Sequence, residues 1–141
     1  MREEKFYGYG IEISELEFHR LQEFVRKYTP DILKEIVGNV ESSVYVQDPD
    51  KTILRWMKEY EYAGSFGFAA YLASVINEQE GTNLKGYDLY GNFLYVPYVM
   101  PWNVPQKMRF MRKADIDSIF KKYLFAITED KLSFDIVEMQ M

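Results

Sequence analysis

The sequence predicts an α+β fold with a small, mostly antiparallel sheet of three to five strands and four or five helices packed against it. Three observations lead to this prediction. Apolar residues alternate near both ends of the chain, an aromatic segment between them has the pattern of a β-hairpin, and stretches with helical spacing separate these strands. The same pattern of short strands and long helical stretches also permits a mainly helical domain with a small sheet, which is the alternative fold.

The first strand and the first helix are predicted from the N-terminal pattern. Residues 5–13 alternate between larger side chains on one face and two glycines on the other, which is typical of a strand. Ser14 and Glu17 then have the spacing of a capping box, in which each side chain bonds a free N–H at a helix start. We therefore expect a helix that begins at this box and runs to about Tyr28.

Two further helices and a short strand are expected in the next third of the chain. Pro30 predicts a helix start, because the first position of a helix needs no N–H donor, and Gly38 predicts its end. Residues 43–47, SVYVQ, predict a short strand. The turn around Pro49 precedes apolar residues at helical spacing up to Tyr60, which predict a further helix.

The strongest helical pattern covers residues 65–80. It is apolar nearly all round, as expected for a helix buried on several sides. Ser65 is the predicted N-cap and Gly81 the predicted end. Residues 114–125 predict the last helix, and residues 132–138 predict the final strand.

The most distinctive segment is the aromatic stretch from Tyr87 to Trp102. Its Gly91-Asn92 pair predicts a two-residue hairpin turn, because glycine adopts the positive φ that such turns need. Both faces of the predicted strand that follows this turn are apolar or aromatic, whereas a sheet with helices on one side needs only one such face. Either other segments cover the second face, or part of it forms a recognition surface or pocket. The residues predicted for this surface are Tyr87, Tyr90, Tyr95, Tyr98 and Trp102.

Positive charge is concentrated in one part of an acidic chain. Residues 103–124 contain six basic and two acidic residues, whereas the whole chain has a net charge of −5. A solvated helix face and an adaptable protein contact both account for this pattern. Basic residues interleaved with apolar ones also occur in single-stranded nucleic-acid grooves, but one such segment in an acidic chain does not lead us to expect a nucleic-acid partner. The predicted basic patch comprises Lys107, Arg109, Arg112 and Lys113.

Few residues suited to catalysis are present. His19 is the only histidine, which excludes a two-histidine metal site, and the absence of cysteine excludes disulfides, thiolate catalysis and thiolate ligands. Gly64-Ser65-Phe66-Gly67 has neither the lysine of a phosphate-binding loop nor the spacing of a nucleophile elbow. We expect no catalytic site, no metal and no cofactor, and a purely structural role for His19.

The length and composition of the chain favour a single globular domain over residues 1–141, located in the cytoplasm. No run reaches the roughly 18 consecutive apolar residues of a membrane span, and the N-terminus lacks the apolar core of a signal peptide. We expect a non-catalytic protein-interaction module of bacterial or phage type, such as an inhibitor, an immunity protein or a regulatory protein. Its partner would be another protein, and an acidic, tyrosine-rich surface suits a basic one.

Two alternatives remain open at this stage. One is a small-ligand-binding protein or enzyme with a pocket between the aromatic hairpin and the central helix. The other is an assembly subunit that forms a homo-oligomer through the hairpin.

Overall fold

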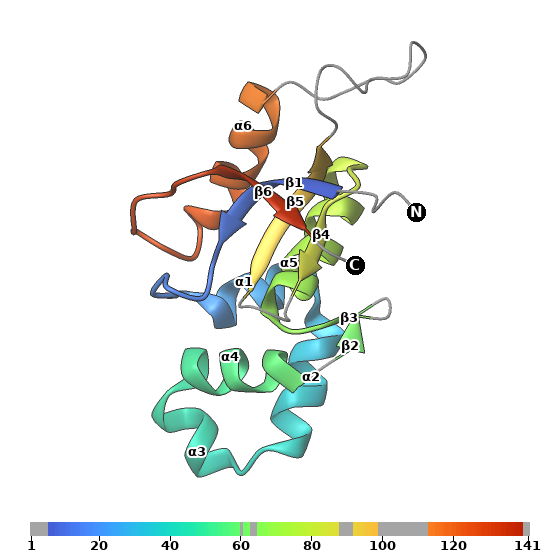
Figure 1. The fold of residues 1–141 in the computed structure, drawn as a ribbon. Coiled ribbons are helices and arrows are strands. Elements are labelled where there is room, and N and C mark those ends of the chain that lie inside the picture. The colour runs from blue at the N-terminus through green and yellow to red at the C-terminus, as the bar shows by residue number, and fades with distance from the viewer. Residues whose placement is uncertain (1–5, 60, 63–64, 88–91, 99–112, 140–141) are drawn as a thin grey trace.

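The structure is a computed structural model that describes residues 6–59, 61–62, 65–87, 92–98 and 113–139. Its centre is a four-stranded antiparallel sheet with the strand order β4-β5-β1-β6 (Figure 1). These strands are β1 (Phe6–Glu12), β4 (Lys85–Tyr87), β5 (Phe93–Tyr98) and β6 (Asp135–Met139). A two-stranded ribbon pairs β2 (Glu61–Tyr62) with β3 (Ser65–Phe66).

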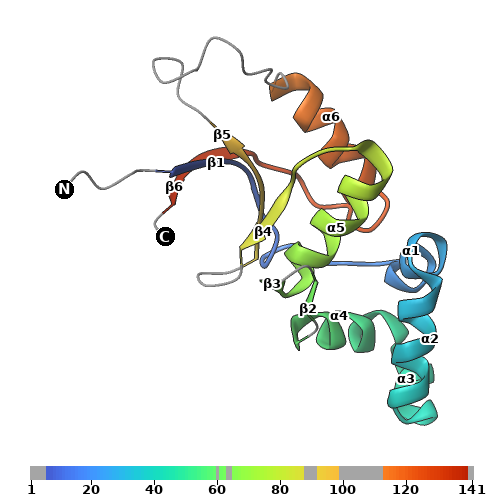
Figure 2. The same cartoon turned by 90° about the vertical axis from the view of Figure 1, so that its right-hand side faces the viewer.

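The described residues also form six helices, so the predicted α+β fold is confirmed with one helix more than expected. They are α1 (Leu21–Tyr28), α2 (Pro30–Asn39), α3 (Ser42–Gln47), α4 (Pro49–Glu59), α5 (Phe68–Glu80) and α6 (Lys113–Leu124). Figure 2 shows α5 and α6 on the same side of the sheet, while α1 to α4 gather at one end of the molecule. None of these helices combines the length and the apolar character needed to span a lipid bilayer, as far as the described residues go.

Strand register decides which side chains face the helices. Tyr9 pairs with Val96, and Ile11 pairs with Leu94. Tyr9, Ile11 and Leu94 are all buried. Because side chains alternate along a strand, the neighbouring Tyr95 points to the opposite side of the sheet.

The central helix is buried as predicted, but its start is displaced. Eight residues of α5 are buried, and they occupy nearly every position from Phe68 to Ile76. Ser65 is not its N-cap, because Ser65 and Phe66 pair with the preceding strand as β3. Gly67 precedes the helix instead, with a φ of 102° that disfavours any other residue type. Gly81 ends the helix in the left-handed conformation, as predicted.

The first helix begins six residues later than the capping box predicted, at Leu21 with Arg20 as its N-cap. The Ser14 hydroxyl donates to the Glu12 carboxylate at 2.7 Å, so it does not cap a helix. The start of α1 is instead held by Asp50 of α4, whose two carboxylate oxygens accept the N–H groups of Arg20 at 3.1 Å and Gln22 at 3.0 Å. A carboxylate that lies 28 residues beyond Gln22 in the sequence therefore takes the place of a local cap.

We expect Asp50→Ala to lower the free energy of unfolding by about 1–2 kcal/mol, as loss of an N-cap does. Urea unfolding followed by circular dichroism measures this. Asp50→Asn retains one acceptor oxygen and should lose less. Asp31→Ala, in the exposed first turn of α2, is the control, since it removes only a favourable charge at a helix start. Equal stability of the two alanine variants would contradict the role assigned to Asp50.

Three other predictions need correction. Residues 43–47 are helical, within α3, because Val44 and Tyr45 donate their N–H groups back to the Glu41 carbonyl. Gly38 lies inside α2, which continues to Asn39. The last strand begins at Asp135 rather than Leu132.

The hairpin register also differs from the prediction. A two-residue turn at Gly91-Asn92 would place Tyr90 opposite Phe93, whereas Phe93 pairs with Tyr87. The connection between the paired strands therefore comprises residues 88–92, of which 88–91 lie outside the described part of the chain.

Candidate functional site

A cleft of about 440 Å³ lies between α5 and the outer strand β4. It combines small side chains of the helix with polar and aromatic side chains of the two neighbouring strands. The described residues that line it are Ala70, Ala73, Ser74, Asn77, Asn83, Leu84, Lys85, Gly86, Tyr87 and Tyr95.

Close contact between α5 and β4 forms the inner end of this cleft. A Cβ atom added at Gly86 would overlap the backbone of Ala69 and Ala70. Only glycine allows the strand to approach the helix this closely. The alanines on this face of α5 then leave space beside the strand where larger side chains would fill it.

Asn77 connects the end of α5 to the segment that leads into β4. Its amide donates to the Leu84 carbonyl at 2.9 Å, and its side-chain oxygen accepts the Leu84 N–H at 2.7 Å and the Thr82 hydroxyl at 2.8 Å. Both polar atoms of Asn77 are thus used in holding β4 beside the helix. Asn77 therefore has a structural role at the cleft.

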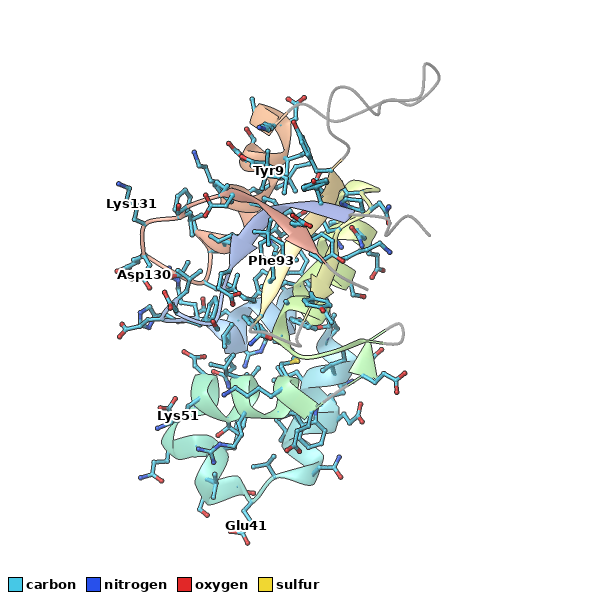
Figure 3. All side chains as sticks on the ribbon, in the orientation of Figure 1. Tyr9, Glu41, Lys51, Phe93, Asp130 and Lys131 are labelled. Atoms are coloured by element: carbon cyan, nitrogen blue, oxygen red, sulfur yellow. The ribbon has the colours of Figure 1, made fainter. Side chains whose placement is uncertain are left out.

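The strand side of the cleft is aromatic and carries one positive charge. The Tyr95 ring stacks on Phe93 with 5.3 Å between centroids, and Figure 3 shows Phe93 near the middle of the sheet. Burial, with a smaller contribution from Tyr87, raises the pKa of Tyr95, so its hydroxyl keeps its proton at neutral pH. Lys85 is exposed.

The predicted recognition residues do not all lie together. Tyr87 and Tyr95 both line the cleft. Tyr98 points to the opposite side of β5, where its ring lies 6.4 Å from that of Tyr9. The other predicted residues of this surface, Tyr90 and Trp102, lie outside the described residues.

Of the predicted basic patch, only Lys113 is described. Its Nζ lies 5.1 Å from the ring centre of Tyr98 and 5.4 Å from that of Tyr9. Tyr9, labelled beside α6 in Figure 3, donates its hydroxyl to Asp117 at 2.6 Å. Burial and then this hydrogen bond raise the pKa of Tyr9 to about 12. This cluster joins α6 to the sheet and is separate from the cleft. Lys107, Arg109 and Arg112 fall outside the described part of the chain.

The C-terminal end of α5 is linked to α6 by hydrogen bonds to a carboxylate. Glu80 accepts hydrogen bonds from Lys122 at 2.8 Å and from Tyr123 at 2.7 Å. These bonds, with that from Lys122 the stronger influence, lower the pKa of the Glu80 carboxyl. A negative charge near a helix C-terminus is unfavourable alone, and here it is compensated by a partner on another helix.

The cleft lies between α5 and the strands of the aromatic hairpin, where the small-ligand alternative placed its pocket. Of its ten described lining residues, only Tyr87 and Tyr95 were among the predicted recognition residues. The eight that were missed include the four polar ones, Ser74, Asn77, Asn83 and Lys85. One sequence feature could have indicated two of them: Ser74 and Asn77 interrupt the apolar pattern on one face of α5.

Comparison with protein-family models, with curated proteins and with solved structures finds no match to this chain. Within the described residues, no group of three His, Cys, Asp or Glu side chains is placed so that it could hold a metal ion.

His19 lies outside the cleft lining and on the surface, in the segment that precedes α1 rather than within a helix. Its backbone N–H donates to the Ile127 carbonyl at 2.7 Å, a bond that any residue except proline can make. We therefore expect His19→Gln to retain full stability and full binding activity. Thermal unfolding and the binding assay described below test this, and a folded variant that fails to bind would contradict it.

Proposed function

We propose that this chain is a non-catalytic protein-interaction module that holds an extended segment of a partner protein in the cleft beside β4. The position of the cleft carries the proposal. Among the described residues β4 is an outer strand of the sheet, and the cleft lies between β4 and α5. Grooves of this kind receive a peptide as an added strand, with backbone hydrogen bonds supplying affinity and side-chain pockets supplying specificity.

The cleft distinguishes β4 from β6, the other outer strand of the described sheet. The cleft lies along β4, and its described lining includes no residue of β6. β4 has glycine at its centre and the cleft along its side.

The cleft lining suits recognition of a peptide. Tyr87 and Tyr95 provide large, rigid surfaces with a polar end, the combination that is enriched in binding hot spots. Because β4 has only three residues, few backbone bonds can form, and we expect affinity of about 1–100 μM.

Small-ligand binding is the second candidate for the same cleft. A volume of about 440 Å³ lies within the range of small-molecule sites. The two functions differ in what they do to β4, since an added strand forms hydrogen bonds directly with its outward-facing backbone amides and so slows their exchange with solvent.

A displayed library of random peptides tests the proposal. We expect peptides selected on the native protein to lose at least about 10-fold in affinity on Ser74→Tyr, because Ser74 is exposed and lines the cleft, so the larger side chain fills the cleft without entering the core. Gln79→Tyr is the matched control, on an exposed position of the same helix outside the cleft lining. Bound peptide should slow amide hydrogen exchange in residues 85–87.

Two results would overturn the proposal. One is that no peptide is enriched, and the other is that enriched peptides bind Ser74→Tyr as well as the native protein. Peptides that bind in the cleft without slowing exchange in β4 would favour a side-chain pocket over strand addition.

A further inference from the structure

Resting on the proposed function, we propose that the segment held in the cleft is acidic and that its carboxylate pairs with Lys85. The inference identifies the partner segment by its chemistry, as an extended peptide with a glutamate or aspartate at one position and an apolar side chain at the next.

Lys85 is the charged residue among the described residues of the cleft lining. It is exposed, and none of the ion pairs among the described residues involves it. In contrast, Lys122 of α6 is paired with Glu80 of α5 at 2.8 Å. Lys85 therefore offers an ammonium group to a partner in the cleft without first breaking an ion pair among the described residues.

The alternation of β4 determines the order of side chains in the bound segment. Lys85 and Tyr87 point to one side of the strand, and Gly86 points to the other, toward the Ala69–Ala70 backbone. A residue of the added strand that lies on the lysine side can pair with the ammonium group. Its immediate neighbour lies on the helix side, against the small side chains of Ala70 and Ala73, where an apolar side chain fits.

The charge of the described cleft lining differs in sign from the net charge of the whole chain. The net charge of −5 suggested a basic partner, but charges more than about 8 Å apart are largely screened at physiological salt. The charge in the cleft itself then decides which segment binds. A basic segment would place two positive charges beside each other at Lys85.

The peptides selected on the native protein test this inference. We expect enrichment of Asp and Glu at one position, and a loss of about 3- to 5-fold in affinity for Lys85→Gln, the size expected of an exposed ion pair. Lys85→Glu should lose more and should prefer peptides in which that acidic residue is replaced by lysine. Lys51→Glu, on an exposed position of α4 outside this cleft, is the matched charge-reversal control and should bind as the native protein does.

Each outcome gives a decision. Acidic enrichment with recovery by the charge swap supports the inference. The inference is overturned if the selected peptides lose affinity on Ser74→Tyr but show no preference for acidic residues, or enrich basic ones. The proposed function would then still stand. Failure of any peptide to depend on the cleft overturns both.

Discussion

Replacing Leu72 by aspartate is expected to destabilise this protein strongly. Leu72 lies in the middle of α5, and its side chain has no exposed surface. The helix is buried along nearly all of its positions from Phe68 to Ile76. A carboxylate at this point would have neither water nor an opposite charge near it, and such a charge is among the most destabilising single changes known.

The expected loss exceeds about 4 kcal/mol, against the 5–15 kcal/mol that a domain of this size has in total. Circular dichroism during urea or thermal unfolding measures it. Ser74→Asp is the control, because it places the same charge two residues away on the exposed side of the same helix, where a change within about 0.5 kcal/mol is expected. An unchanged melting temperature for Leu72→Asp would show that α5 is not the central element of the core.

Replacing Gly86 by alanine should destabilise the protein by about 3 kcal/mol, although only one methyl group is added. The added Cβ would overlap backbone atoms of Ala69 and Ala70 at the start of α5. Backbone in a buried helix cannot move aside as a flexible side chain can, so strand and helix must separate. Since this contact forms the end of the cleft, peptide binding should fall with stability.

Gly38→Ala is the matched control for Gly86→Ala. Gly38 lies inside α2, and a Cβ added there meets no atom within 4 Å. Because alanine is favoured over glycine in a helix, this variant should gain about 0.5–1 kcal/mol. Opposite signs for the two substitutions, measured by urea unfolding, are the expected result. If Gly86→Ala were also neutral or stabilising, the close contact between β4 and α5 would be wrong.

Predictions from the sequence were confirmed where buried side chains recur at a regular spacing along a single segment. The helical period predicted α5, α2, α4 and α6, and strand alternation predicted β1, because each of these patterns records which side chains face the core. The end of α5 at Gly81 was also predictable, since a left-handed C-terminal residue favours glycine for local reasons.

Predictions from the sequence were wrong where a contact with a distant residue, and not the local motif, determines the structure. Ser14 and Glu17 match a capping box, yet α1 is capped by Asp50 of α4. Residues 43–47 alternate as a strand does, but no strand of the described sheet pairs with them, and the Glu41 carbonyl holds them in a helix. In each case the local pattern was compatible with two structures, and a contact elsewhere selected one.

The sequence by itself thus determined the fold class, the buried central helix and the aromatic strand that lies beside the cleft. The tertiary structure alone decided the register of β4 on β5, the close approach of Gly86 to α5 and the position of Lys85 at the cleft. The physical reason is that periodicity reports how each segment divides its side chains between core and solvent. The cleft, in contrast, arises from the distance between two segments, and that distance depends on packing between residues that are far apart in the chain.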